Sequence, residues 1–358
     1  MAPSSGKGWG MIHEYVGNVH LHTTHSDGTA TPEEVARIAG EAGLDFVIPT
    51  DHDIYVPGLE GWRGDTLLLI GEELVAGTRQ EPGNHFLAFG VGEELAPFAG
   101  DPQGLIDAVN QREGVGFVAH PFERAAPKFG ERALPWLDWQ VQGYTGISIW
   151  NYMSEFKSYL PSLPAALWAV LFPQSVIRGP LPETLAKWDE LLQTRRLPAI
   201  GASDAHATWY RLGPLKLQVF PYAYLFRAVN LHLLTPAPLR RDWRADQGVI
   251  YAAMREGRSF VAYDLIGPAR GFRFTASAGE VEAGLGEELA IGEGALLEAR
   301  SPLPAELRLI HGGRVVARAR GQSLRFLARE PGAYRVEAYR RHWLRWRGWV
   351  FTNPIYLR

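Results

Sequence analysis

The chain has 358 residues, of which 46% are hydrophobic and 21% charged, values typical of a folded protein with one large and one smaller domain. It contains no cysteine, so disulfides and thiolate ligands are excluded, and nitrogen and oxygen ligands would favour manganese, iron or zinc. The formal net charge of −3 argues against a dedicated nucleic-acid binder. Because no apolar run approaches the ~20 residues of a membrane helix and the start lacks a signal-peptide core, we expect a cytoplasmic protein without membrane contact.

The first predicted strand carries two histidines on one face. Over residues 19–22, Val and Leu alternate with His20 and His22, and a strand directs alternate side chains to the same side. Asp27 follows on the turn into the next helix and would bring a carboxylate to the same place. Since imidazole is the commonest ligand for transition metals, the pattern favours a metal site over two polar residues on a solvated strand.

The same arrangement recurs along the chain. A helix is predicted from Pro32 to Ala42, because a capping box precedes it at Thr31 and Gly43 ends it. Six further apolar strands follow, and polar residues stand at their ends. These are Asp51, His52 and Asp53 at the second strand, Glu72 or Glu73 at the third, His85 at the start of the fourth, His120 at the fifth, Trp150 and Asn151 at the sixth, and Asp204 and His206 at the seventh.

Short apolar strands that alternate with helices predict a parallel sheet buried on both faces. Functional residues at the carboxyl ends of successive strands are typical of a (β/α) barrel. A doubly wound sheet is the alternative, but it concentrates function at one switch point, whereas here nearly every strand contributes. We therefore predict a barrel over residues 1–266, with a proline-punctuated insertion at about 154–182.

The hydrophobic pattern of the sequence changes after Gly267. Short segments with period-two patterning, separated by Gly-Gly, Glu-Pro-Gly and Ser-Pro turns, predict a small antiparallel β-sandwich over residues 267–358. This part has 15 Arg and 9 Glu with no Lys or Asp, a net charge of +6, so the preceding part carries −9. The negative charge suits a barrel that gathers cations. His232 lies among apolar residues and is expected to be structural.

Nine potential ligands share the strand ends, enough for up to three divalent ions. The alternative is a structural network of buried imidazoles paired with carboxylates. The set comprises His20, His22, Asp27, His52, Glu73, His85, His120, Asp204 and His206.

These motifs resemble those of the PHP (polymerase and histidinol phosphatase) superfamily, in order and in spacing. The quoted segments are His20-Leu-His22, Ser26-Asp27-Gly28, Thr50-Asp51-His52, Gly71-Glu-Glu73, His120-Pro121 and Ser203-Asp204-Ala-His206. The resemblance implies a distorted barrel of about seven strand–helix units with a trinuclear metal site. By analogy, His20, His22, Glu73 and Asp204 hold one ion, Glu73 bridges to a second held by His85 and His120, and Asp27, His52 and His206 hold a third.

The late β-sandwich and the absence of polymerase modules make the chain similar to standalone PHP hydrolases, including carbaryl-hydrolase-like proteins. Ser148 departs from the pattern, because many relatives have glutamate there. The resemblance implies a metal-bridging hydroxide as nucleophile, with Asp27, His52 and His206 as assisting groups. Asp51 and Asp53 are candidates to orient imidazoles, or simply turn residues.

Candidate substrate contacts are cationic, histidine and aromatic side chains near the predicted ligands or on the insertion. The candidates are His25, Arg124, Trp150 and Arg211, together with Lys157 and Arg178 on the insertion. Each cation has a solvated surface position as its alternative, and Trp150 a place in the core. The run at residues 340–349 alternates basic and aromatic residues, as in single-strand nucleic-acid platforms, or forms a strand with a charged outer face.

We expect a metal-dependent phosphoesterase that hydrolyses a small phosphomonoester or phosphodiester, with nucleotides among the candidates. The closest alternative keeps the metals and cleaves a carbamate or carboxylic ester. A third hypothesis is a non-catalytic, metal-containing binding protein.

Overall fold

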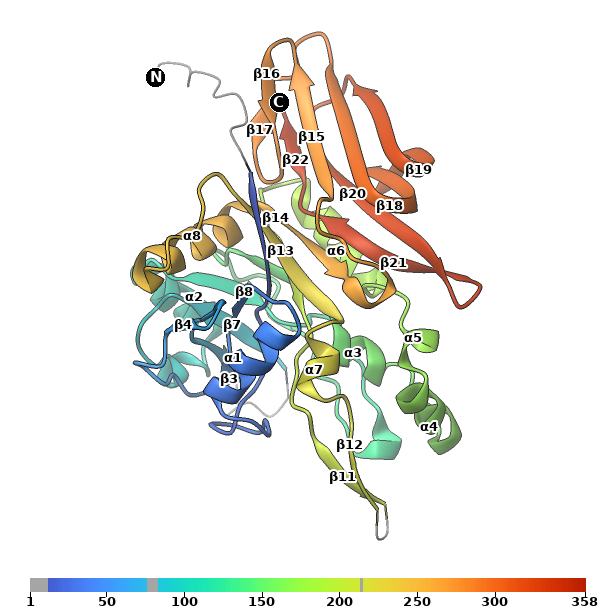
Figure 1. Ribbon diagram of the computed structural model, residues 1–358. Coiled ribbons are helices and arrows are strands. Elements are labelled where there is room, and N and C mark those ends of the chain that lie inside the picture. The colour runs from blue at the N-terminus through green and yellow to red at the C-terminus, as the bar shows by residue number, and fades with distance from the viewer. Residues whose placement is uncertain (1–11, 76–82, 213–214) are drawn as a thin grey trace.

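The computed structural model describes residues 12–75, 83–212 and 215–358. It is a mixed α/β structure with a curled sheet and a second, larger sheet, and the strands from the last part of the chain stand above the curled sheet (Figure 1). Among the described residues, no helix combines the length and apolar character needed to cross a bilayer.

The curled sheet has six strands and carries most of the predicted ligands. In spatial order they are β10 (Ala199–Ala202), β9 (Gly146–Asn151), β8 (Val115–Val118), β7 (Phe86–Phe89), β6 (Gly71–Leu74) and β3 (Thr50–His52). Only β7 runs antiparallel to both neighbours, which differs from the all-parallel expectation. The reason is that residues 75–85, which join β6 to β7, are fewer than the dozen or so that a parallel crossover requires.

The segment that carries His20 and His22 joins the two edges of this sheet. On one side, the Leu21 carbonyl accepts a hydrogen bond from Thr50 N in β3 at 2.8 Å. On the other, His22 N donates to the Ala205 carbonyl and Asp204 N donates to the His20 carbonyl, both at 2.9 Å, just beyond β10. The first histidines are thereby held between the first and last strands of the sheet, at the mouth of the curl.

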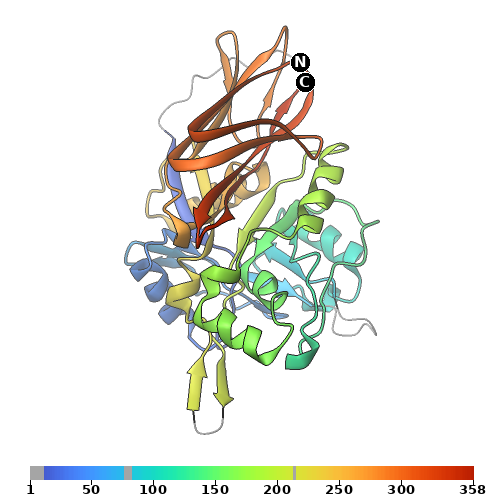
Figure 2. The same ribbon diagram turned by 90° about the vertical axis from the view of Figure 1, so that its right-hand side faces the viewer.

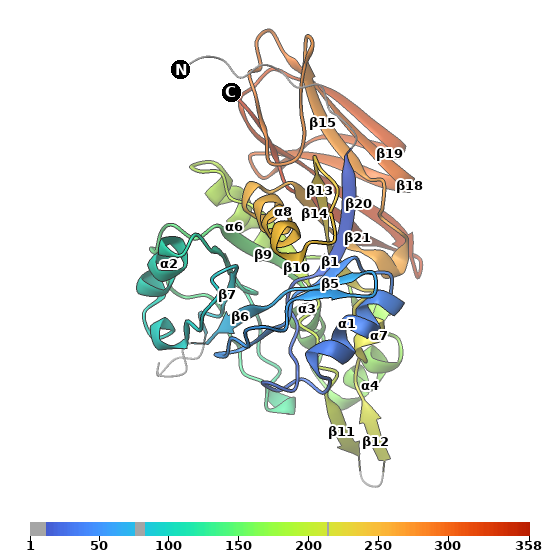
Figure 3. The same cartoon turned by 60° about the vertical axis from the view of Figure 1, so that its left-hand side comes forward.

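Helices pack against strands of both sheets (Figures 1 and 3). They are α1 (Pro32–Glu41), α2 (Pro102–Gln111), α3 (Tyr152–Lys157), α4 (Leu163–Leu171), α5 (Pro173–Val176), α6 (Pro182–Leu192), α7 (Tyr222–Leu225) and α8 (Trp243–Glu256), with short 3-10 turns at Ala96–Phe98, Pro127–Phe129 and Asp264–Ile266. The predicted capping box of α1 is present, because Thr31 Oγ1 accepts from Glu34 N and Glu34 Oε2 accepts from Thr31 N. The predicted insertion forms α3, α4 and α5.

The larger sheet spans both predicted regions of the chain. Its main path is β16 (Val281–Ala283), β15 (Arg273–Ala278), β18 (Ala295–His311), β20 (Gly332–His342), β21 (Arg345–Thr352), β14 (Ser259–Tyr263), β13 (Val229–Thr235), β1 (His13–Asn18), β2 (Phe46–Val47), β5 (Thr66–Leu68) and β4 (Gly61–Arg63), with β17 (Glu288–Leu289), β19 (Arg314–Ala328) and β22 (Ile355–Leu357) beside it. A separate hairpin pairs β11 (Trp209–Leu212) with β12 (Leu215–Gln218) and projects from the molecule (Figure 2).

Backbone pairing therefore continues across the predicted boundary at residue 267. Strand β14 pairs antiparallel with β21, with Phe260 opposite Thr352 and Val261 opposite Phe351. The two regions share a hydrogen-bonded sheet and one continuous core, so the late strands support the strands from which the ligands project.

His232 has the structural role expected from its apolar surroundings. It is buried on β13, with Nδ1 2.9 Å from Glu14 Oε1 and Nε2 3.2 Å from Asp264 Oδ2, and its ring stacks on Phe260. Burial opposes the charge on this histidine, but Asp264 and Glu14 outweigh it and raise the pKa of His232 to about 9.

This raised pKa predicts a pH dependence of stability. Because the pKa of His232 in the folded chain exceeds the ~6.5 of an unfolded histidine, its contribution is fully present below about pH 6.5 and is lost as the pH rises toward 9. In urea unfolding, the advantage of the wild type over His232→Gln should shrink over that window by on the order of 3 kcal/mol. An advantage that is the same at pH 6 and pH 9.5 would contradict this role.

Candidate metal centre

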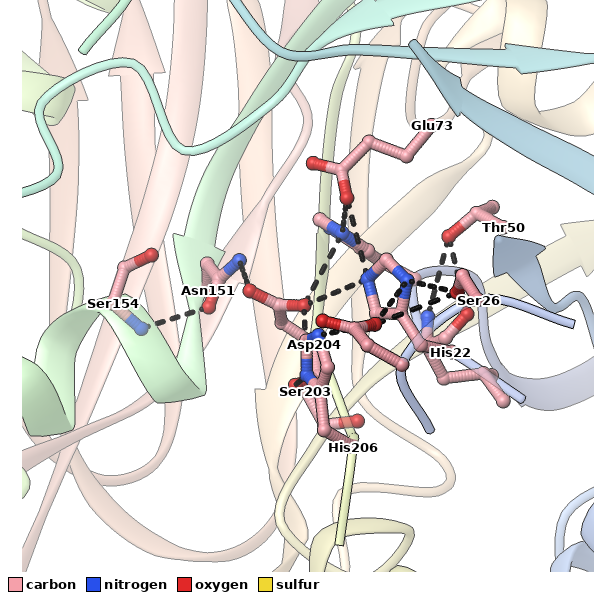
Figure 4. Close-up of polar contacts among 12 residues, drawn as sticks. His22, Ser26, Thr50, Glu73, Asn151, Ser154, Ser203, Asp204 and His206 are labelled. Carbon is pink, nitrogen blue, oxygen red and sulfur yellow. Dashed lines mark hydrogen bonds and ion pairs between the residues drawn. The ribbon is translucent and has the colours of Figure 1, made fainter. Parts of the chain in front are cut away.

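The structure brings the nine predicted ligands together at the mouth of the curled sheet. Figure 4 shows four of them, His22, Glu73, Asp204 and His206, with their polar contacts. Candidate ligand atoms lie within 4.8 Å of one another in four overlapping groups. The groups are His22, Asp27, His52 and His206; His20, His22, Glu73 and Asp204; His52, Glu73 and His85; and His120, Glu123 and Asp204.

Glu73 is the centre of this arrangement. Its side chain is 1% exposed, and its Oε2 lies 3.1 Å from His20 Nε2 and 3.2 Å from both His22 Nε2 and His52 Nδ1. The other oxygen, Oε1, lies 2.9 Å from His85 Nδ1 and 3.1 Å from His120 Nε2. One carboxylate thus faces two separate sets of imidazoles, the arrangement that a bridging ligand requires.

The neighbouring glutamate takes a different role. Glu72 Oε2 accepts a hydrogen bond from Leu95 N at 2.9 Å, and Glu72 belongs to none of the four groups. Adjacent residues of a strand point to opposite faces, so β6 directs Glu73 toward the imidazoles and Glu72 toward the loop that contains Leu95. The strand pattern alone left both residues open, and the resemblance selected Glu73.

Asp204 joins the two sides of the centre. Its Oδ1 lies 3.1 Å from His22 Nε2 and 3.4 Å from His20 Nε2, while Oδ2 accepts from Asn151 Nδ2 at 3.1 Å. The backbone of Asp204 has φ +58° and that of His120 has φ +22°, values that non-glycine residues rarely adopt. Backbone strain of this kind is retained where the surrounding structure fixes a functional side chain.

Asp27 marks the open side of the centre. Its side chain is 58% exposed, and Oδ1 lies 3.2 Å from His206 Nε2, 3.7 Å from His22 Nδ1 and 3.8 Å from His52 Nε2. His52 and His206 are also partly exposed, whereas Glu73 is enclosed. A substrate can therefore approach the cluster from the side of Asp27.

Asp51 and Tyr222 hold this turn in place, and Asp51 thereby takes the turn role that was one of its two predicted alternatives. Asp51 accepts from Thr23 N and Thr23 Oγ1 at 2.7 Å, and from Ser26 Oγ at 2.6 Å, so it fixes the turn that carries His22 and Asp27 and does not contact an imidazole. The Tyr222 hydroxyl in α7 donates to the His22 carbonyl at 2.7 Å. Asp53 accepts from Val75 N at 2.8 Å and so acts on the loop after β6.

Glu123 is a further residue that the strand pattern missed, because it follows His120 in an irregular loop. Its carboxylate lies 3.7 Å from His120 Nδ1 and accepts from Lys157 Nζ at 2.7 Å and Ser154 Oγ at 2.5 Å. It thereby orients the face of His120 that points away from Glu73. The insertion contributes to the centre through Ser154 and Lys157, so Lys157 is bound to protein groups rather than free for an anion.

The charges of the centre are strongly coupled. Burial alone would raise the pKa of Glu73, but the imidazoles, His20 foremost, hold it well below its usual value. Asp204 is affected in the same way, again with His20 as the largest opposing influence. Burial opposes protonation of His22, but hydrogen bonds to Asp204 and Glu73 raise its pKa to about 10.

The donor set fits divalent cations. Two ring nitrogens that face Glu73, His20 Nε2 and His52 Nδ1, are buried and lie 3.1 and 3.2 Å from Glu73 Oε2 without forming a hydrogen bond. Buried polar atoms normally find a partner, and neutral imidazole nitrogens beside carboxylates are the donors that manganese, iron or zinc accept. For His52, burial is the main influence and lowers the pKa to about 4, so its ring is neutral and able to bind a metal at neutral pH.

The predicted substrate contacts are scattered. His25 is exposed on the same turn as Asp27, close to the open side. Arg124 is bound to Glu183, and Trp150 is buried, with Nε1 donating to Glu155 Oε2 at 2.8 Å and its ring packed against Phe351. Trp150 therefore belongs to the core. Arg211 lies in β11, and its side chain falls outside the described part of the chain.

The basic and aromatic run at residues 340–349 is not one continuous strand. It forms the end of the β20–β21 hairpin, with a turn at Trp343 and Leu344. Arg340 stacks on Trp349, while Arg347 is buried. These side chains therefore do not form a single flat row.

No known family model matches this chain, and no curated protein matches it. Among solved structures, it is similar to a two-domain protein from Bacteroides vulgatus that contains a domain predicted to be a PHP-like metal-dependent phosphoesterase, with 15% identity, a TM-score of 0.42, and coverage of 96% of this chain and 95% of that chain.

Two further solved structures are similar over a shorter length. One is a protein from Bifidobacterium adolescentis proposed to be a metal-dependent phosphoesterase, with 18% identity, a TM-score of 0.33, and coverage of 53% of this chain and 87% of that one. The other is an amidohydrolase from Chromobacterium violaceum with bound sulfate and no metal, with 14% identity, a TM-score of 0.32, and coverage of 57% and 92%. The assignment of the centre rests on the side-chain geometry given above.

Neutralising Glu73 should release metal. Glu73→Gln removes the negative charge shared by five imidazoles, so we expect the metal content after dialysis, measured by plasma mass spectrometry, to fall by more than half. Glu72→Gln, on the same strand but outside the cluster, is the matched control and should keep the wild-type content. Retention of full metal content by a folded Glu73→Gln variant would show that Glu73 is not a ligand.

Metal affinity should rise with pH. Burial opposes protonation of His120, but Glu123 and Glu73 raise its pKa to about 9, and the pKa of His22 is about 10. Both rings are protonated at neutral pH without metal, and a cation must displace these protons. Affinity measured by chelator competition should therefore increase up to about 10-fold per displaced proton for each pH unit between 7 and 9. An affinity independent of pH over this range would contradict the assignment of both histidines.

Proposed function

We propose that this protein is a metal-dependent phosphoesterase of the PHP type, which hydrolyses a phosphomonoester or a phosphodiester at a centre of two or three divalent ions. The observation that carries the proposal is the position of Glu73, whose two oxygens face different sets of imidazoles within 2.9–3.2 Å. A shared carboxylate between neighbouring cation sites suits a reaction in which negative charge develops on several oxygens at once.

Three groups of residues would hold the ions. His20, His22, Glu73 and Asp204 form the buried group, His85 and His120 face the other oxygen of Glu73, and Asp27, His52 and His206 form the group open to solvent. When bound, such ions lower the pKa of a coordinated water to near neutrality and neutralise phosphoryl oxygens.

The residues of the open side assist the reaction by position. Burial would raise the pKa of Asp27, but its hydrogen bond to His206 outweighs this and lowers the pKa to about 2, so the carboxylate is ionised throughout the working range. Asp27 therefore holds the rings of His206 and His52 toward an incoming ester. His25 on the same exposed turn is placed to contact the leaving group.

The closest alternative is hydrolysis of a carbamate or carboxylic ester at the same centre. Both reactions use an activated water and a polarised oxygen, so the donor set does not separate them. A non-catalytic metal-binding protein would hold the ions in the same cluster but hydrolyse no substrate. The open side formed by Asp27, His52 and His206 favours an enzyme, because a purely structural site gains nothing from access to solvent.

The bond that is cleaved can be tested directly. Purified protein loaded with Mn²⁺ or Zn²⁺ should hydrolyse p-nitrophenyl phosphate or bis-p-nitrophenyl phosphate faster than a naphthyl carbamate. Asp27→Asn should lower kcat by about 100-fold or more while the buried ions remain, whereas the exposed Glu33→Gln should match the wild type. Faster cleavage of the carbamate would support the alternative, and full metal content with no turnover on any substrate would support the binding protein.

A further inference from the structure

A second pocket lies between the insertion and the end of the β20–β21 hairpin. Its volume is about 510 Å³, within the range of small-molecule sites. In Figure 1, α4 and α5 lie next to the hairpin end, and the contact of Phe172 with Trp343 joins the two elements. None of its lining residues belongs to the groups of the metal centre. They include Tyr159, Trp168, Arg178, Trp343, Arg345 and Arg347.

Three guanidinium groups line this pocket without a carboxylate partner among the described residues. Arg178 and Arg345 are exposed at its rim. Arg347 is 2% exposed; it donates to the Ser175 carbonyl, and its Nε is buried with no hydrogen-bond partner. Burying a cation without a paired counter-charge is costly. Burial together with repulsion from Arg178 and Arg345 lowers the pKa of Arg347, and the charge of Glu155 offsets this only in part. None of the residues that line the pocket is an Asp or a Glu.

The carboxylate of Glu155 acts on Arg347 from a distance and forms no salt bridge with the three guanidinium groups. Glu155, in α3, accepts from Arg178 N at 2.5 Å, from Gly179 N at 3.1 Å and from the Tyr159 hydroxyl at 3.1 Å. Its other oxygen accepts from Trp150. These hydrogen bonds satisfy Glu155 through backbone and neutral groups, so none of the three guanidinium groups pairs with it.

Aromatic side chains form the walls. Trp168 and Trp343 are about half exposed, and Trp168 is held by a hydrogen bond from Nε1 to Ser175 Oγ at 2.9 Å. Tyr159 lies under the guanidinium of Arg178, with 5.2 Å between that group and the ring centroid. Flat, half-exposed rings beside unpaired guanidinium groups suit a planar ring linked to an anion, because the ring stacks while the anion meets the cations.

We propose that this pocket binds a nucleotide-like small molecule, a planar heteroaromatic ring that carries a phosphate, at a site separate from the metal centre. The phosphate meets Arg178, Arg345 and Arg347, and the ring lies against Trp168 and Trp343. Asn151, which donates to Asp204 in the metal centre, caps the N-terminus of α3, and Ser158 and Tyr159 in the pocket wall directly follow the other end of this helix. A ligand here therefore contacts the residues at the far end of the helix whose start supports the metal centre.

The exposed apolar side of α4 offers a competing interpretation. Leu163, Leu167 and Leu171 are exposed beside the pocket, and basic residues next to apolar ones also suit an anionic lipid surface. The pocket is favoured because a buried guanidinium such as Arg347 can meet a ligand that enters a cavity but not the headgroups of a flat bilayer.

The test is calorimetric titration of the full-length, metal-loaded protein with the phosphonate analogue of AMP, whose phosphorus–carbon bond resists ester hydrolysis. We expect binding that Arg178→Gln/Arg345→Gln weakens at least 10-fold. Trp343→Ala should weaken binding of the analogue but not of inorganic phosphate. Arg244→Gln is the matched control, because Arg244 is an exposed arginine stacked on Trp243 at 4.4 Å, outside the pocket, and it should bind as the wild type.

Three outcomes would overturn the proposal: no binding at millimolar analogue, binding unchanged in the double variant, or binding only to phosphatidylglycerol vesicles or to single-stranded oligonucleotides. Metal content and hydrolysis of p-nitrophenyl phosphate are measured on the same samples. Both should be unaffected by the double variant, so failure of the pocket and failure of the proposed phosphoesterase activity are separate results.

Discussion

The charge balance around Glu73 is the constraint on which the centre depends. Five imidazoles lie within 2.9–3.2 Å of a carboxylate that is 1% exposed, and a cluster of this kind is costly to bury unless the charges compensate one another. Strand β6, which carries Glu73, lies next to the edge strand β3, which carries His52, and only β7 separates it from β8, which precedes His120. The segment with His20 and His22 then closes the sheet over Glu73.

The ligands could be predicted from the sequence because the ends of buried strands can be recognised in it. Apolar runs followed by His, Asp or Glu mark residues that buried strands deliver to one edge, and the structure brings that set together. Two supporting residues gave no such signal. Glu123 and Tyr222 act from a loop and a short helix, and their contacts depend on three-dimensional arrangement rather than on periodicity. Asp51 stands at a strand end in the sequence, but only the structure shows that it fixes a turn.

The strand directions and the relation between the two regions were also beyond the sequence pattern. Strand β7 runs antiparallel to its neighbours because the connection from β6 to β7 is short, and this direction is seen only in the pairing of the strands. Likewise, β14 and β21 lie far apart in the chain, and the composition change at residue 267 gives no hint that they pair. The same pairing directs the β20–β21 hairpin, so that its end and α4 together form the pocket with Arg178 and Arg347.

The most direct test of the central claim is anomalous X-ray diffraction from crystals of the protein loaded with Mn²⁺ or Zn²⁺. If the centre holds metal as proposed, anomalous peaks will lie on both sides of the Glu73 carboxylate, one toward His20, His22 and Asp204 and another toward His85 and His120. Crystals with saturating metal that show no peak near Glu73, or peaks only on the protein surface, would contradict the account.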